Sequence, residues 1–206
     1  SAASDVYKRQ LISLTCLYFL SGGFNSAIAS DREGNFLHSV SQDIINDYND
    51  LESFSSGDLD NYSEINISNA SDSTAIIKQR SPGITANNRA KITQRGGSNS
   101  AFIDQSGRNN TALIDQDGSN NYAAIGQLGI NSEALISQDG SNNLAVIGQA
   151  NFSRNGSKLS IDQQGNNNTA FMAGSRGSNL GISQDGNDFA LVKASSSMRI
   201  HINQAN

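Results

Sequence analysis

An eleven-residue repeat constrains the fold of this chain more than any other feature of its sequence. Within residues 90–149 the pattern Ala-x-Ile-x-Gln occurs six times, with copies that begin at Ala90, Ala101, Ala112, Ala123, Ala134 and Ala145. In each copy Ala, Ile and Gln lie two residues apart, which is the period of a β-strand, so their side chains share one face. A polar turn follows each Gln, most clearly the sequence Asp-Gly-Ser-Asn-Asn after Gln116 and Gln138. This regular alternation of strand and turn predicts a repeat architecture.

The repeat continues in both directions when small insertions are allowed. Further copies are predicted to begin at Ile65, Ala75, Leu159, Ala170, Leu180, Ala190 and Ile200. Two gaps are longer, one around Pro82 and one through residues 151–157, and proline is compatible with a loop there but not with a strand inside a sheet. The apolar residue two positions after each start predicts a core ladder of Ile67, Ile77, Ile92, Ile103, Ile114, Ile125, Ile136, Ile147, Ile161, Met172, Ile182, Val192 and Ile202.

A flat sheet would leave the Ile face uncovered, so we expect alternate strands to fold over one another. The predicted fold is an all-β, amyloid-like β-solenoid with about 22 residues per turn and two facing parallel sheets. Successive turns stack about 4.8 Å apart, which places equivalent residues above one another. A buried Gln needs a hydrogen-bond partner, and a stack of amides provides one. The predicted structural Gln ladder consists of Gln79, Gln94, Gln105, Gln116, Gln127, Gln138, Gln149, Gln163, Gln184 and Gln204.

The two predicted sheets differ in this ladder. In one sheet the amides are expected to run without a break from Asn69 to Gln204, whereas in the other Gly174 and Ala194 replace Gln toward the C-terminus. An Asn or Ser two residues before most starts shares the inward face with Ala, Ile and Gln. The outward positions are expected to be solvated, and they include Lys91, Asp104, Asp115, Gly126, Ser137 and Asp162.

The first 29 residues have the pattern of a secretory signal peptide. Residues 1–10 match nothing downstream, and we interpret most of them as non-native sequence. Positive charge at Lys8 and Arg9, a short apolar stretch and the small-x-small sequence Ala27-Ile28-Ala29 predict cleavage before Ser30. The only cysteine, Cys16, would be removed with this segment, so the mature chain would contain no thiol.

Residues 30–62 are acidic and precede the repeat region, which we assign to residues 63–206. Apolar residues between Phe36 and Leu51 fall at rough helical spacing, which allows a short amphipathic helix. The favoured interpretation is a flexible leader.

The repeats resemble those of the curlin family, the subunits of the secreted functional amyloid curli. The resemblance rests on the many in-register copies of Ala-x-Ile-x-Gln-x-Gly-x-x-Asn, paired into units of about 22 residues behind a signal peptide. It implies an exported subunit that leaves a Gram-negative cell through a dedicated outer-membrane pore and polymerises on the cell surface. The implied partners are other curlin subunits, the secretion pore and its accessory proteins.

The last repeat resembles the aberrant, cationic last repeat of the minor curlin subunit, which nucleates and anchors the fibre. Its basic residues Lys193, Arg199 and His201 are therefore the predicted surface-attachment residues. Two alternatives stay open, namely a major fibre-forming subunit and a solenoid adhesin that does not form amyloid.

Other classes of function find little support in the sequence. A net charge of −5 provides no basic surface for nucleic acid. The two histidines, His38 and His201, are far apart and the outward Asp residues are scattered, so no catalytic residues, small-molecule substrate or cofactor are predicted. The turns lack the spacing of calcium-binding solenoids, and no metal site is predicted. No regular Thr array of an ice-binding solenoid is present.

Overall fold

The computed structural model describes residues 61–81 and 86–205, and this part of the chain is built from thirteen β-strands without a helix. The predicted signal peptide, most of the predicted leader and Pro82 lie outside the described residues. The strands are β1 (Asn61–Ser68), β2 (Thr74–Arg80), β3 (Asn88–Gly97), β4 (Ser100–Arg108), β5 (Thr111–Ser119), β6 (Tyr122–Ile130), β7 (Ser132–Ser141), β8 (Leu144–Asn151), β9 (Ser157–Asn166), β10 (Thr169–Ser175), β11 (Asn179–Asp185), β12 (Phe189–Lys193) and β13 (Arg199–Ala205).

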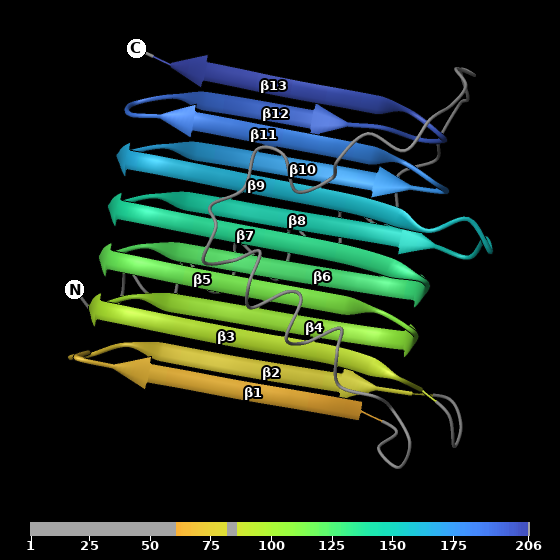
Figure 1. Ribbon diagram of the computed structural model, residues 1–206, viewed down its shortest axis with the longest axis horizontal. Coiled ribbons are helices and arrows are strands. Elements are labelled where there is room, and N and C mark those ends of the chain that lie inside the picture. Colours follow the sequence, from red (N-terminus) through yellow and green to blue (C-terminus); the bar gives the residue numbers. More distant parts are fainter. Residues whose placement is uncertain (1–60, 82–85, 206) are drawn as a thin grey trace, which may run out of the picture.

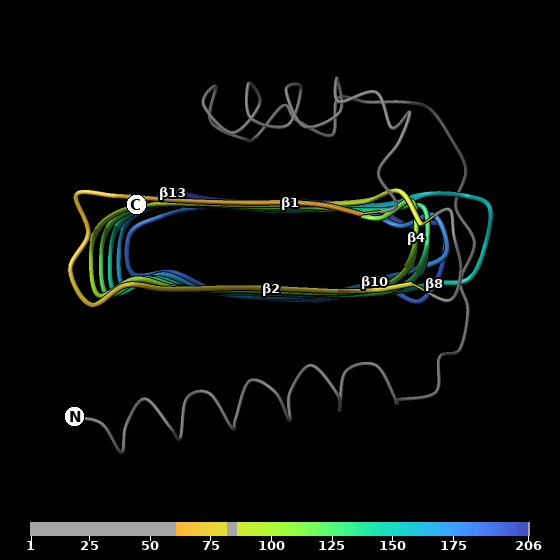
Figure 2. The same cartoon turned by 90° about the horizontal axis from the view of Figure 1, so that it is seen from below.

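The strands form two parallel sheets that face each other. Odd-numbered strands make a seven-stranded sheet in the order β1-β3-β5-β7-β9-β11-β13, and even-numbered strands make a six-stranded sheet in the order β2-β4-β6-β8-β10-β12. Figure 1 shows the strands stacked along the solenoid axis, and Figure 2 shows the two layers joined by turns at both ends. Two strands make one turn, and Ile92 pairs with Ile114, which pairs with Ile136. The predicted all-β solenoid with a 22-residue turn is confirmed.

The space between the sheets is filled by Ala and Ile. Ile92, Ile114 and Ile136 are fully buried, as are the Ala residues two positions before them. The β-branched Ile suits a strand, and the small Ala lets the sheets approach each other closely. Burial of one such Ile contributes about 1.5–3 kcal/mol, and the stack repeats this contribution at every turn.

The corners that join consecutive strands contain stacked residues with a left-handed backbone. Asn120 and Asn142 occupy equivalent corners with φ of 57° and 60°. Gly118 has a φ of 109°, and a Cβ built there would lie 1.9 Å from the carbonyl oxygen of Gly140 on the next turn. Asn tolerates the left-handed region, whereas the backbone contact at Gly118 leaves no room for any side chain.

The register of the first turn differs from the prediction. The first copy was expected to begin at Ile65, with Asn69 in the amide ladder, but β1 pairs Ile65 with Ile92 and Ile67 with Gln94. This register stacks an Ile upon an Ile. Asn69 has a φ of 50° and follows the end of β1, so its backbone cannot continue the strand.

The prediction of a solvated outer face is wrong for the middle of the seven-stranded sheet. Asp115, Ser137 and Asp162 have exposed fractions of only 6%, 7% and 4%. Because the strands stack in register, the side chains of neighbouring turns contact these groups. Arg95 Nη1 lies 3.2 Å from Asp115 Oδ1, and Ser137 hydrogen-bonds Asp162. Lys91, Asp104 and Gly126 are half-buried.

We predict that Asp162 makes the fold less stable at neutral pH than in mild acid. Burial raises the pKa of Asp162 from 3.8 to about 6, a rise that hydrogen bonds from Ser137 and Gln164 oppose and the charge of Asp139 favours. Between these pH values the folded state keeps a proton that the unfolded state has released, so stability falls as the pH rises from about 4 through about 6. The loss is at most about 3 kcal/mol.

Urea unfolding at pH 4 and pH 7 measures this effect. Asp162→Asn should stabilise the protein at pH 7 and flatten the pH dependence, whereas Asp72→Asn, at an exposed position of the first turn, should change it little. An unchanged pH dependence in Asp162→Asn would show that the buried carboxyl is not its source.

Candidate functional site

Two ladders of glutamine amides run along the solenoid. The first amide ladder lies in the seven-stranded sheet and joins its members by Nε2–Oε1 hydrogen bonds of 2.8 Å, lengthening to 3.0 Å at the last step. It consists of Gln94, Gln116, Gln138, Gln163, Gln184 and Gln204. The second amide ladder lies in the six-stranded sheet, with bonds of 2.8 Å between Gln79, Gln105, Gln127 and Gln149. The eight members from Gln94 to Gln184 are buried.

The second N–H of each amide is used to tie the two sheets together. Gln127 Nε2 donates to the backbone oxygens of Thr111 and Ser132, at 3.0 and 3.1 Å. Gln105 Nε2 contacts the carbonyls of Arg89 and Asn110 in the same way. These carbonyls fix the orientation of each amide, because only the nitrogen can donate to them.

A spine of buried Asn side chains supports the corners. Asn110 Oδ1 accepts a hydrogen bond from the backbone N–H of Ser132 on the next turn, and Asn110 Nδ2 donates to the carbonyl of Gly129. Asn121 makes the equivalent bonds to Asn143 N and Gly140 O. The inward parity of these Asn residues was visible in the sequence, but their bonding to the corner backbone was not.

The ladders have a direction. In every bond the Nε2 belongs to the earlier Gln and the Oε1 to the Gln one turn later, so acceptors face the N-terminal end (β1 and β2) and donors face the C-terminal end (β12 and β13). Gln94 Oε1 is buried without a hydrogen-bond partner among the described residues, because β1 places Ile67 opposite it. At the other end, Gln204 Nε2 donates to Phe189 O.

The second amide ladder stops at Gln149. Gly174 pairs with Gln149 in the next turn, and Ala194 follows β12 at the corresponding position. A Cβ at Gly174 would lie 2.6 Å from Ser178 Oγ and 2.9 Å from Leu159 Cδ1. A side chain cannot enter this position without rearranging the core, so the gap is built into the packing of the last turns.

The three predicted attachment residues do not form one cluster. Lys193, Arg199 and His201 are all exposed and belong to the last turn. Lys193 lies on the outer face of the six-stranded sheet, whereas Arg199 and His201 lie on the outer face of the seven-stranded sheet. In the part of the chain that the structure describes, no cluster of three or more His, Cys, Asp or Glu could hold a metal ion.

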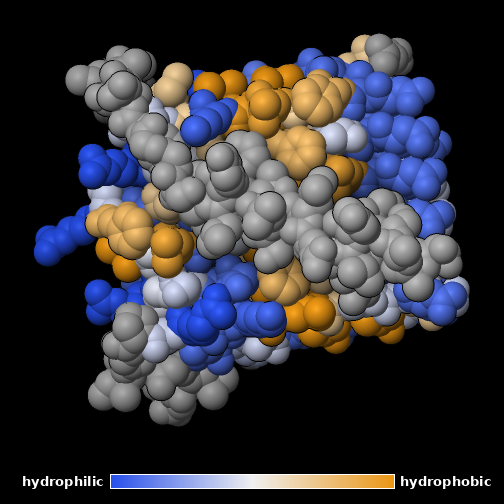
Figure 3. All heavy atoms as spheres, turned by 180° about the vertical axis from the view of Figure 1, so that it is seen from behind, coloured by the Kyte–Doolittle hydropathy of each residue, from blue (hydrophilic) through white to orange (hydrophobic). Residues whose placement is uncertain are grey.

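The outer face of the six-stranded sheet carries apolar side chains that the sequence analysis did not single out. Ile76, Phe189 and Leu191 are exposed, and the Phe189 ring lies 6.4 Å from that of Phe171. Figure 3 shows apolar groups on this face, with hydrophilic groups beside them. Their alternation with inward residues would have revealed them. No helix in the described ranges is long and apolar enough to span a membrane.

Comparison with known proteins identifies the central turns. The model of the curlin associated repeat matches residues 85–118 and 107–140. Residues 85–140 are therefore similar to curlin repeats. The matched region includes β3 to β6 and all but the last residue of β7, where Ala, Ile and Gln are stacked without exception. No curated protein and no solved structure matched the chain.

We predict that removing one amide from the first ladder destabilises the solenoid locally. Gln116 accepts from Gln94 Nε2 and donates to Gln138 Oε1, both at 2.8 Å. Gln116→Leu would leave the Gln138 oxygen without its donor in a buried site and would cost about 1–3 kcal/mol. Asp139→Asn, at an exposed position beside Gln138, should cost little. Urea unfolding midpoints compare the two variants, and equal midpoints would contradict a stabilising role of the ladder.

Proposed function

We propose that this chain is a secreted subunit of a curli-type extracellular fibre, and that it nucleates and anchors the fibre. The curlin repeats and the solenoid fold support a structural role rather than an enzymatic one. The observation that carries the more specific proposal is that the two ends of the solenoid do not match each other.

The ends are open sheet edges. The backbone groups of an edge strand that point away from the sheet can pair with a strand of another chain. Because β1 and β13 are the two edges of one sheet, and β2 and β12 those of the other, a second copy stacked along the axis would pair β13 with β1 and β12 with β2. This arrangement would extend both sheets in parallel.

Neither amide ladder continues across such a junction between two copies. With Ile202 aligned on Ile65, Gln204 of one copy faces Ile67 of the next, and Ala194 faces Gln79. Each unpaired amide that becomes buried costs about 1–3 kcal/mol. A different curlin subunit with Gln at both terminal positions would pair with Gln79 at one end and Gln204 at the other. The end residues therefore favour pairing with another subunit over pairing with a copy of this chain.

Each region then has a separate role. The regular turns within residues 65–149 present the template, with the Oε1 of Gln79 as the acceptor that starts the second ladder. Residues 190–206 attach the subunit to an anionic surface or an accessory protein at the outer membrane, with Arg199 and His201 on one face and Lys193 on the other. A secretion pore would export the chain before it folds.

A major fibre-forming subunit is the second candidate. It is favoured by the first amide ladder, which reaches Gln204 in the last strand without a break. The two candidates differ in how readily the pure protein polymerises with itself.

We predict that Ile67→Gln accelerates self-polymerisation. The new amide would supply a donor for Gln94 Oε1 within the chain and an acceptor for Gln204 of a second copy. Ile67 is 45% exposed, so little apolar burial is lost. Ile76→Gln is the matched control, because Ile76 is 39% exposed and lies on the outer face of β2, away from both ladders. Thioflavin T kinetics of the pure protein should show a shorter lag for Ile67→Gln only. Rapid polymerisation of the unmodified chain would instead identify it as a major subunit.

We predict that the basic residues of the last turn retain the protein on cells. The triple variant Lys193→Glu, Arg199→Glu and His201→Glu should be shed into the medium, while its ability to seed a second curlin subunit in solution is preserved. Arg154→Glu changes another exposed cation and should not cause shedding. Immunoblots of cell and medium fractions measure retention. A triple variant that stays on cells but no longer seeds would reverse the assigned roles.

A further inference from the structure

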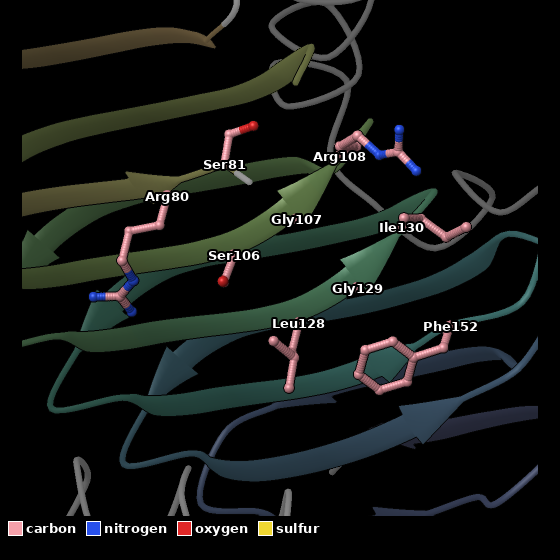
Figure 4. Close-up of a pocket in the computed structure, with 9 residues that line it drawn as sticks. All are labelled: Arg80, Ser81, Ser106, Gly107, Arg108, Leu128, Gly129, Ile130 and Phe152. Atoms are coloured by element: carbon pink, nitrogen blue, oxygen red, sulfur yellow. The ribbon is translucent and has the colours of Figure 1, made fainter. Parts of the chain in front are cut away.

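A groove of about 480 Å³ opens where β2, β4 and β6 end. Its apolar side is formed by Leu128, Ile130 and Phe152, and its cationic side by Arg80 and Arg108 (Figure 4). The repeated turns alone do not make this groove, because Phe152 comes from the insertion at residues 151–157 that interrupts the eleven-residue period.

The insertion keeps the Phe152 side chain exposed. Asn151 Nδ2 donates to Ile130 O at 2.9 Å and to Asn155 O at 2.8 Å, which closes the loop against the end of β6. Phe152 is nevertheless 71% exposed, and Leu128 is 37% exposed. Figure 4 shows the Phe152 ring beside Leu128. An aromatic ring fixed beside aliphatic side chains in an open groove is the arrangement that anchors an apolar side chain of a partner.

The charged side of the groove selects for an acidic partner. Arg80 is paired with Asp104, and its Nη2 lies 2.7 Å from Asp104 Oδ1. Arg108 forms no ion pair with any residue of the described ranges, and in Figure 4 its guanidinium points away from the sheet. A carboxylate held against Arg108 would form a charge-assisted hydrogen bond.

The chain itself contains a segment with this chemistry. Residues 50–60 read Asp-Leu-Glu-Ser-Phe-Ser-Ser-Gly-Asp-Leu-Asp, with four carboxylates, three large apolar residues and no basic residue. The segment lies outside the described residues and joins β1 directly at Asn61. In Figure 1, β1 begins on the same side of the solenoid, the right-hand side of the view, on which β2, β4 and β6 end.

The length of the segment fits this placement. Turns are about 4.8 Å apart, so the groove lies within roughly 15 Å of the first turn along the axis. Eleven residues span at most about 35–40 Å when extended. We propose that the groove binds the acidic segment 50–60 of the same chain, with carboxylates against Arg108 and an apolar side chain such as Phe54 between Leu128 and Phe152. The bound segment then runs across the first turns of the solenoid and connects its N-terminal end to its middle.

A tryptophan introduced at position 54 reports on this binding, because the natural chain contains no Trp. In the full chain carrying Phe54→Trp, kept monomeric as shown by size exclusion, we expect blue-shifted emission and an iodide quenching constant well below that of the urea-unfolded protein. Adding Arg108→Glu or Phe152→Ser should shift the emission to the red and raise the quenching constant toward the unfolded value. High salt should weaken the protection, since exposed charge pairs are screened.

Matched controls separate the groove from general effects. Arg176→Glu reverses another exposed cation, and Leu191→Ser removes another exposed apolar side chain far along the six-stranded sheet, so neither should change the emission of the introduced tryptophan. Far-UV circular dichroism verifies that each variant keeps its strands. An indole as accessible as in the unfolded chain, or one that Arg108→Glu and Phe152→Ser leave unchanged, would overturn the proposal. Protection that increases with protein concentration would overturn it too, by assigning the groove to the segment of a second copy.

Discussion

The need of a buried amide for a partner is the constraint on which this structure depends. A glutamine side chain placed between two sheets would be unfavourable in isolation, because its donor and acceptor would both lose water. Here each central amide has one neighbour above and one below, and it also donates to a backbone carbonyl of the facing sheet. The bonds therefore connect turns along the axis and sheets across it. A single register satisfies all of them at once, which explains why Gln stacks upon Gln through most of the solenoid.

The corners adapt the backbone to this stacking. The spine of Asn side chains bonds the backbone of the next turn, and the Gly before it allows carbonyl groups to approach where a Cβ would collide. The strands and the corners therefore both favour the same repeat of 22 residues per turn of the solenoid. Where this agreement fails, at Gly174 and Ala194, the second amide ladder ends although the strands continue in parallel. The strand hydrogen bonds and apolar core are therefore sufficient to continue the solenoid for a few turns without a full set of amides.

The direction of the amide ladders determines which hydrogen-bonding groups are present at each end of the solenoid. Amide donors at one end and acceptors at the other would suit stacking of identical subunits. At such a junction, however, Ile67 would face Gln204 and Ala194 would face Gln79, so neither contact joins two amides. The interior is strongly self-complementary and the ends are not. This contrast between a uniform middle and mismatched ends is the physical argument for the proposed role in fibre nucleation. The insertion at residues 151–157 adds a different kind of surface, since the first amide ladder continues past it from Gln138 to Gln163 and the insertion places an aromatic ring outside that ladder.

The sequence by itself determined the fold class, because Ala, Ile and Gln at a spacing of two can be buried together only on one face of a strand. It also determined which residues stack upon which in the central turns, since a one-residue slip would move every Ile to the outer face. Only the tertiary structure decided the register of β1, where Ile65 and Ile67 compete for the same position and pairing with Ile92 selects between them. It alone showed that Asp115 and Asp162 are buried, that Lys193 is separated from Arg199 and His201, and that Phe152 reaches the groove. Periodicity specifies which way a side chain points, but burial and proximity depend on neighbours from other turns that lie distant in the sequence.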